Sequence, residues 1–375
     1  MSADAALALD LETRGRTDGR VLEARPTIGF GRAAAALLVA TACTPLAERE
    51  AVAPVRIPLP DPVQGANLRE VGDLRRGYGS TTARRTMRRL KTMGVNTLGI
   101  LVEAQLSDGN DRTLDVERKA FERARQALLD ANELGLATVF VPQLRLADGT
   151  WRGRLAPDGA PGSERWWSGY REFVLRAARI GEEASASALS LGVELKGLSA
   201  RAGPAVRMRS LARQAREVFS GPLTYHANWD EADQVRFWDA VDLVGINAYY
   251  PLQPDPIRGA EGVAAELAAL AGRTDRPVVA WEVGFRSGPV PHLEPWAWPD
   301  DVHPVVDQAA QARAWAAVLS AWLPAPGVRG LMIWVVPTDP DDPASEPAHG
   351  FNPLNKRAER VIARAFGDDR SRAAR

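Results

Sequence analysis

The stretch Arg276–Arg286, RPVVAWEVGFR, contains a short apolar run that ends on an acidic residue. Val278 and Val279 are β-branched, which suits a strand that is covered on both faces. Glu282 follows this run directly, and a carboxylate is costly to bury unless it is paired or has a chemical role. We therefore predict a strand over Pro277–Trp281 that delivers Glu282 to a functional site.

A second stretch, far upstream, repeats this pattern. Ala188–Gly197, ALSLGVELKG, is another apolar run that ends on a carboxylate, Glu194. Two strands thus each place a glutamate at their carboxyl end, and we predict that these two glutamates are catalytic. Because neighbouring side chains alternate along a strand, we expect Trp281 to point away from the site if Glu282 points into it.

Apolar runs and amphipathic segments alternate through the rest of the chain. The other predicted strands are Val63–Leu68, Asn96–Val102, Ala137–Gln143, Leu189–Glu194, Leu223–Ala227, Leu243–Tyr249 and Gly330–Val335. The predicted helices are Thr81–Met93, Asp115–Leu134, Glu164–Glu182, Pro204–Phe219, Gly262–Ala271, Val306–Leu323 and Asn355–Phe366. Strands that are apolar throughout and joined by helices indicate a parallel sheet with both faces covered.

Eight such units in one chain, with no change of composition between them, favour a single α/β domain, a closed (β/α)8 TIM barrel. An open doubly wound sheet is the alternative architecture. That fold usually has a glycine-rich phosphate-binding turn after its first strand, and Gly65-Ala66-Asn67 does not match such a turn. We therefore predict the closed barrel.

Charge and composition narrow the classes of partner. Lys+Arg and Asp+Glu number 47 each, so the formal net charge is zero and there is no basic surplus for nucleic-acid binding. The chain has four histidines and one cysteine, with neither an HExxH motif nor a clustered His/Cys set. We expect no nucleic-acid partner, no metal and no organic cofactor.

The N-terminal region resembles an export signal. Ala33–Ala42, AAAALLVATA, is too short to span a bilayer as a mature helix and fits the apolar part of a signal peptide. Cys43 follows at once, as in a bacterial lipoprotein, where this cysteine is lipidated. We predict export and a lipid anchor in the cell envelope; the alternative is an N-terminal tail on a cytosolic protein. The predicted parts are signal (1–43), Pro/Ala-rich tether (44–62), barrel (63–367) and charged tail (368–375).

The barrel hypothesis places both glutamates at one end, because active sites of this fold lie at the carboxyl ends of the strands. Paired carboxylates are what glycoside hydrolysis requires: one protonates the leaving oxygen, while the other attacks the sugar or activates water. Aromatic and polar side chains near the strand ends suit sugar rings and their hydroxyl groups. The predicted substrate-binding residues are Gln143, Trp151, Arg152, His226, Asn228, Trp229, Tyr249, Tyr250 and Trp334.

Several blocks of sequence together resemble one family of glycosidases. From Gln64 to Ala365 the sequence is similar to glycoside hydrolase family 113, the (β/α)8 β-mannanases of a large retaining clan. The resemblance rests on the order and spacing of QGANL, MGVNTLGI, DGTWRG, LGVELKG, LTYHANW, FWDAVDLVGINAYYPL, VVAWEVGF and HGFNPLNKRAERVI.

The resemblance implies a general acid/base at Glu194 and a nucleophile at Glu282, steadied by Tyr249 or Tyr250. It implies an endo-acting retaining hydrolase for β-1,4-mannan or glucomannan. Val193 departs from the clan pattern, because an asparagine commonly precedes the acid/base. Two alternatives follow: a glycan-binding barrel without turnover, and another β-glycosidase of the same clan.

Overall fold

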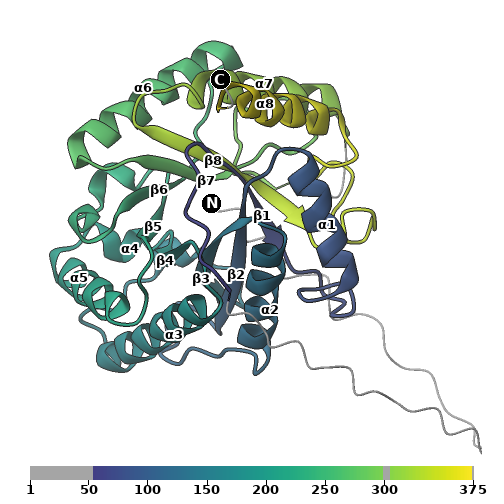
Figure 1. Ribbon diagram of the computed structural model, residues 1–375. Helices are drawn as coiled ribbons and strands as arrows, with labels where there is room; N and C mark the ends of the chain where they lie inside the picture. The colour runs from purple at the N-terminus through teal and green to yellow at the C-terminus, as the bar shows by residue number, and fades with distance from the viewer. Residues whose placement is uncertain (1–53, 299–304, 374–375) are drawn as a thin grey trace, which may run out of the picture. The chain divides into compact units, whose positions relative to one another are not determined.

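Eight parallel strands close into a barrel in the computed structural model, which describes residues 54–298 and 305–373 (Figure 1). Each strand pairs with the next along the chain, and the last pairs with the first. The strands are β1 Val63–Arg69, β2 Thr97–Leu106, β3 Ala137–Leu146, β4 Ala188–Val193, β5 Leu223–Asn228, β6 Leu243–Asn247, β7 Val278–Val283 and β8 Val328–Pro337. The predicted TIM barrel is therefore confirmed.

Helices surround the barrel on its outside (Figure 1). The α-helices are α1 Thr81–Thr92, α2 Ala120–Glu133, α3 Ser163–Glu183, α4 Lys196–Ser199, α5 Ala202–Arg216, α6 Pro256–Thr274, α7 Gln308–Trp322 and α8 Arg357–Ala373. Short 3-10 turns are η1 Arg152–Arg154, η2 Ala232–Gln234 and η3 Trp238–Ala240. The helices lie antiparallel to the strands, so their amino ends and the carboxyl ends of the strands share one face.

Two helices, α2 and α6, begin at other residues than the sequence predicts. Asp115 exchanges backbone hydrogen bonds with Gln105 as an antiparallel bridge, so α2 begins only at Ala120. The sixth helix begins earlier than predicted, at Pro256, because the Asp255 carboxylate caps it by accepting a hydrogen bond from the Ile257 backbone N–H at 3.0 Å.

Side chains inside the barrel form a core separate from the one between strands and helices. The inner core consists of Leu59, Val63, Ala137, Val139, Val141, Ala188, Val193, Leu243, Val279, Trp281 and Met332. The prediction that Trp281 points away from the site is wrong. The register between β7 and both of its neighbours shifts near this residue, and such a bulge lets consecutive side chains escape strict alternation.

Trp281 is accommodated because β6 has a glycine opposite it. A Cβ atom on Gly245 would lie 2.4 Å from the Trp281 ring and 2.4 Å from the Tyr225 carbonyl oxygen, so this position has no room for a side chain. The Trp281 indole N–H donates to the Thr224 hydroxyl at 3.0 Å, which satisfies the polar atom inside the barrel.

The residues just before β1 contact the barrel. Leu59 is buried, the Pro54 carbonyl accepts a hydrogen bond from Ser185, and the Leu59 carbonyl accepts one from Arg329. Positions 54–62 of the predicted tether are therefore held against the domain. The predicted signal segment and Cys43 lie outside the described residues, as do positions 374–375 of the predicted tail, whereas α8 continues to Ala373.

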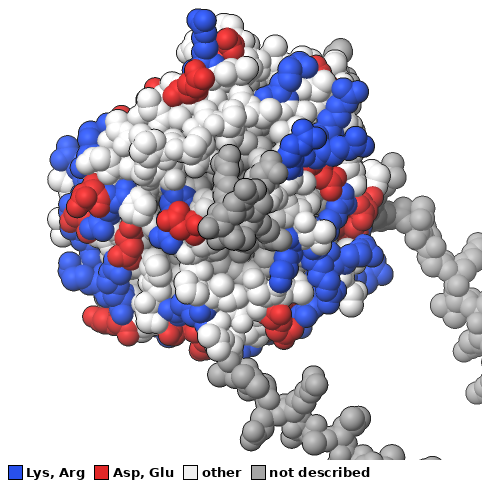
Figure 2. Space-filling model, turned by 45° about the horizontal axis from the view of Figure 1, so that its top comes forward, with Lys and Arg blue, Asp and Glu red and all other residues white. Residues whose placement is uncertain are grey.

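Charges of both signs are interspersed on the face that Figure 2 shows. Ion pairs between the helices and loops include Arg89 with Glu359 at 2.7 Å and Arg216 with Asp242 at 2.9 Å. Within the part of the chain that the structure describes, no helix is both long enough and apolar enough to span a membrane.

Candidate active site

Glu194 lies one residue beyond β4 and is 2% exposed. Its carboxylate accepts hydrogen bonds from the Trp151 indole N–H at 2.8 Å and from the Asn247 amide at 3.0 Å. The Arg152 guanidinium is 3.7 Å from the same oxygen that Trp151 contacts. Residues from two separate segments of the chain, the loop after β3 and strand β6, therefore hold this buried carboxylate in one orientation.

The backbone at Glu194 is in the left-handed region, with φ at +51°. This conformation costs an L-residue other than glycine roughly 1–2 kcal/mol. Such strain persists where the surrounding contacts over-determine the backbone, and it concentrates at functional sites. The Glu194 N–H donates to the His226 carbonyl at 2.7 Å, which is one of those contacts.

The loop after β3 brings Trp151 and Arg152 to Glu194. The Trp151 ring passes over Gly153, where a Cβ atom would lie 2.5 Å from the ring, so the DGTWRG loop requires glycine there. Arg152 is 4% exposed and donates to the Leu144 carbonyl at 3.4 Å. Both residues predicted from this loop therefore contact, or lie close to, the Glu194 carboxylate.

Glu282 lies within β7 and is 4% exposed. The Tyr249 hydroxyl donates to its carboxylate at 2.8 Å. The sequence left open whether Tyr249 or Tyr250 plays this part, and it is Tyr249 that makes the contact. Tyr250 packs instead against Trp229, with ring centroids 5.6 Å apart.

Strand β6 connects the two carboxylates. Asn247 donates to Glu194 and is the register partner of Glu282, and Tyr249, two residues further, donates to Glu282. Sequence reasoning missed Asn247. Alternation along the strand could have found it, because Gly245, Asn247 and Tyr249 are two residues apart and therefore share a side of the sheet.

Four predicted or newly found site residues have a buried polar atom without a protein partner among the described residues. These atoms are Gln143 Oε1, His226 Nε2, Asn247 Oδ1 and Trp334 Nε1, on β3, β5, β6 and β8. A buried polar atom that stays unpaired costs free energy. Their presence near two carboxylates suits a ligand rich in hydroxyl groups.

His226 stacks on Trp281 inside the barrel, with ring centroids 5.1 Å apart. Burial lowers the pKa of this imidazole to about 3, so the ring is neutral in ordinary buffers. A neutral imidazole can both donate and accept a hydrogen bond, which fits the predicted role of His226 in binding a sugar hydroxyl.

Aromatic rings continue from the carboxylates outward along the loops after β5, β6 and β7. Trp229 stacks on Trp296, with centroids 5.6 Å apart and an interplanar angle of 18°. Beside them is a pocket of about 390 Å³, lined by Trp229, Asp230, Asp233, Gln234, Tyr250, Pro251, Gln253, Val263 and Glu266. The amide of Asn228, another predicted substrate-binding residue, donates to Asp230 at 2.7 Å. Trp334 belongs to a buried cluster with Tyr249, Val335 and Phe351, and Trp229 and Trp296 pack against this cluster.

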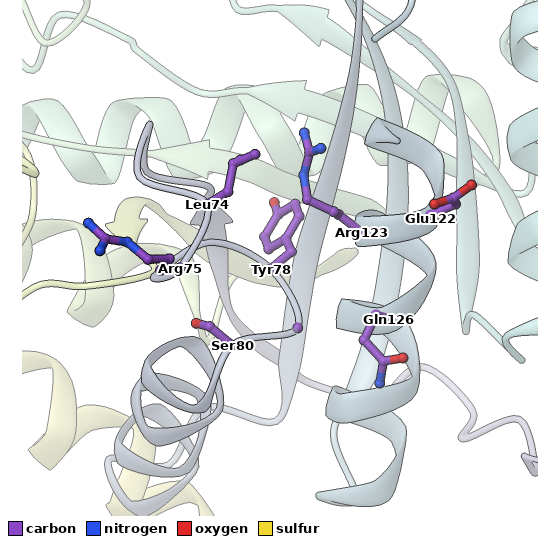
Figure 3. Close-up of a pocket in the computed structure, with 8 residues that line it drawn as sticks. Leu74, Arg75, Tyr78, Ser80, Glu122, Arg123 and Gln126 are labelled. Atoms are coloured by element: carbon purple, nitrogen blue, oxygen red, sulfur yellow. The ribbon is translucent and has the colours of Figure 1, made fainter. Parts of the chain in front are cut away.

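A second pocket, of about 430 Å³, lies between the β1–α1 loop and α2 (Figure 3). Its lining consists of Leu74, Arg75, Tyr78, Gly79, Ser80, Glu122, Arg123 and Gln126. It contains none of the predicted site residues. Nor do residues 54–298 and 305–373 contain a cluster of three or more His, Cys, Asp or Glu side chains arranged to hold a metal.

The chain is similar to known glycoside hydrolases in sequence and in fold. The sequence profile of glycoside hydrolase family 113 matches residues 72–350 of the chain. A β-mannanase of that family from Alicyclobacillus acidocaldarius, solved in complex with ManMIm, is 25% identical. The two structures superpose with a TM-score of 0.71 over 82% of this chain and 97% of the mannanase.

Two further structures share the fold at lower identity. A β-1,4-mannanase of family 113, solved as a complex, is 20% identical, with a TM-score of 0.71 over 82% of this chain and 99% of that one. A β-glucuronidase from Ruminococcus gnavus is 14% identical, with a TM-score of 0.58 over 82% of this chain and 50% of that enzyme. No curated protein sequence matches the chain.

Proposed function

We propose that this chain, which belongs to glycoside hydrolase family 113, cleaves β-1,4-linked mannan or glucomannan with retention at the anomeric carbon. The single observation that carries the proposal is the arrangement around β6. Asn247 and Tyr249 contact one carboxylate each, so Glu194 and Glu282 are held on either side of one strand at the same barrel end. The 25%-identical β-mannanase supports the choice of substrate.

In the first proposed step, a carboxylate oxygen of Glu282 attacks the anomeric carbon. The glycosidic C–O bond breaks, and Glu194 gives its proton to the leaving oxygen. The product is a glycosyl ester on Glu282 and a shortened glycan with a free hydroxyl. The Tyr249 hydroxyl, bonded to Glu282, keeps the attacking carboxylate in line.

In the second proposed step, Glu194, now ionised, removes a proton from water. The water oxygen attacks the anomeric carbon, and the ester bond to Glu282 breaks. Glu282 leaves as a carboxylate and Glu194 is again protonated, so both groups return to their starting states. Two displacements on one carbon retain its configuration.

The side chains around the carboxylates supply the binding surface in this proposal. The unpaired polar atoms of Gln143, His226 and Trp334 can bond to sugar hydroxyls. Trp229 and Tyr250, which border the 390 Å³ pocket, can receive a sugar unit further along the chain by stacking on its C–H face. Val193 packs in the apolar inner core, and the side-chain amide that donates to the acid/base is that of Asn247.

The test is a reducing-end assay on β-mannan, glucomannan, cellulose and xylan. We expect the wild type to release reducing ends from the mannans, and Glu282→Ala to abolish release without loss of folding. Glu133→Gln on α2, an exposed carboxylate far from the site, serves as the matched control and should retain full activity. Proton NMR of the first product should show the β-anomer.

Two results would change the assignment. Mannan turnover by Glu282→Ala at the wild-type rate would exclude the proposed nucleophile. Glycan binding by the wild type without release of reducing ends would identify the non-catalytic alternative. Azide separates the two glutamates: it should restore turnover of an aryl glycoside by Glu194→Ala and yield the β-glycosyl azide, because azide needs no general base.

We also propose that the protein is exported and lipid-anchored through Cys43. The support is the sequence alone, an apolar run of ten residues followed directly by this cysteine. Metabolic labelling with an alkyne fatty acid in a bacterial host should mark the wild type and not Cys43→Ser. Equal labelling of both proteins would exclude the anchor.

A further inference from the structure

The Leu195 amide, next to the strained Glu194 peptide, is hydrogen-bonded to a side chain of the neighbouring strand β5 and not to the backbone of that strand. Its N–H donates to the hydroxyl oxygen of Tyr225 at 2.7 Å. The preceding N–H, that of Glu194, is bonded to the β5 backbone at the His226 carbonyl. One of the two contacts that hold this left-handed turn therefore depends on a side chain that can be altered by mutation.

The Tyr225 hydroxyl is held in turn by a buried glutamate. It donates to Glu231, which is 0% exposed, while the second Glu231 oxygen accepts the Asn228 backbone N–H at 3.1 Å. The Tyr225 ring packs edge-on against Phe237, with centroids 4.9 Å apart. Ring, hydroxyl and carboxylate are thus all restrained.

Glu231 determines which way the Tyr225 hydroxyl proton points. A tyrosine hydroxyl has one proton to donate. Because that proton is committed to Glu231, an oxygen lone pair faces the Leu195 N–H. Without the carboxylate the hydroxyl could rotate and donate elsewhere, and the amide would lose its acceptor.

A carboxylate is a costly way to fill this space. Desolvation raises the pKa of Glu231 to about 7, and the nearby Glu194 acts in the same direction. An apolar side chain would avoid the cost of burying an acid. Glu231 is connected to the turn at Glu194 through a single side chain, Tyr225, which suggests a role for the buried acid in holding that turn.

We propose that Tyr225 and Glu231 form a positioning pair that fixes the peptide at Glu194–Leu195 and so aims the Glu194 carboxyl group. This inference rests on the proposed role of Glu194 as acid/base. Neither residue touches the substrate in this scheme. Their loss should weaken proton transfer by Glu194 and leave the attack by Glu282 intact.

Tyr225→Phe removes the hydroxyl and keeps the ring. The diagnostic substrates are mannohexaose, whose leaving group must be protonated, and 2,4-dinitrophenyl β-mannobioside, whose leaving group need not be. We expect kcat/KM on mannohexaose to fall about tenfold or more, since general acid catalysis contributes roughly 10²–10⁴-fold. On the dinitrophenyl glycoside kcat/KM should stay within about threefold of wild type, because that constant covers steps only up to ester formation.

Tyr78→Phe is the matched control. The Tyr78 hydroxyl likewise accepts a backbone N–H, from Leu101 at 3.2 Å, and donates to a backbone carbonyl, that of Leu68. Tyr78→Phe therefore also loses one accepted backbone N–H and one donated hydroxyl proton in a different part of the barrel, although the acceptor is a carbonyl and not a carboxylate. Glu231→Gln supplies one acceptor where two are needed, so its selective loss on mannohexaose should be smaller than that of Tyr225→Phe.

Equal losses on both substrates in Tyr225→Phe, of the size seen in Tyr78→Phe, would show a general effect on the fold and overturn the positioning role. A second measurement does not need turnover: hydrogen exchange at the Leu195 amide should accelerate in Tyr225→Phe and not in Tyr78→Phe. Unchanged exchange would also overturn the inference. If the wild type hydrolyses neither substrate, yet exchange at Leu195 is faster in Tyr225→Phe than in the wild type, the proposed function is wrong and the positioning contact is still supported.

Discussion

Replacing Tyr249 with phenylalanine removes the hydroxyl that donates to Glu282 at 2.8 Å and leaves the ring in its buried place. A hydrogen bond to a charged group contributes about 1.5–3 kcal/mol net. At 1.36 kcal/mol per factor of ten, we expect kcat/KM at neutral pH to fall by roughly 10- to 150-fold.

The assay measures kcat/KM between about pH 4 and about pH 8 on mannohexaose and on 2,4-dinitrophenyl β-mannobioside. Because the nucleophile acts on both substrates, both values should fall together, unlike the selective loss expected for Tyr225→Phe. Tyr78→Phe again controls for the loss of a buried hydroxyl. Less than about a threefold change on both substrates would refute the reasoning that Tyr249 acts through Glu282.

Three further predictions concern the same barrel end. Gly245→Ala should lower the free energy of unfolding by about 1–3 kcal/mol, because the new methyl group collides with Trp281, and an unchanged urea midpoint would contradict this. Asn247→Ala removes the amide donor to Glu194 and should lower kcat/KM on mannohexaose by about tenfold or more, with the urea midpoint as control for folding. Glu231, with its pKa raised to about 7 in the folded state, binds its proton more tightly there than in the unfolded chain. The stabilisation by Glu231 is therefore fully present below about pH 4.5. As pH rises from there to about 7, the free energy of unfolding of the wild type should fall by about 1.4 kcal/mol per pH unit. The stability of Glu231→Gln relative to wild type should increase across the same window.

The barrel was predictable because each of its elements is encoded locally. The run at 278–281 is apolar and begins with two β-branched residues, and the helices between the strands have one apolar face. The errors occur where a distant contact competes with a local preference. Asp115 reads as the start of a helix, yet its backbone pairs with Gln105 across a turn.

A glycine explains the other misplaced helix. Gly259 and Gly262 weaken the helical pattern after Asp255-Pro256, so the sequence favours a later start for α6. A Cβ atom at Gly259 would lie 1.4 Å from the Leu252 carbonyl oxygen. The glycine is therefore there for a close approach between the helix and the loop before it, which no local pattern reveals.

Local sequence patterns encode the eight strands, their order and the placement of Glu194 and Glu282 near strand ends, because hydrophobic period and turn residues act over a few positions. Three features follow from the folded barrel alone: Tyr249 contacts Glu282, Asn247 donates to Glu194, and Trp281 points inward. These outcomes depend on strand register and on bulges in β4 and β7. Register is the result of pairing between segments far apart in the chain, so a one-residue shift changes every side-chain contact without changing any local pattern.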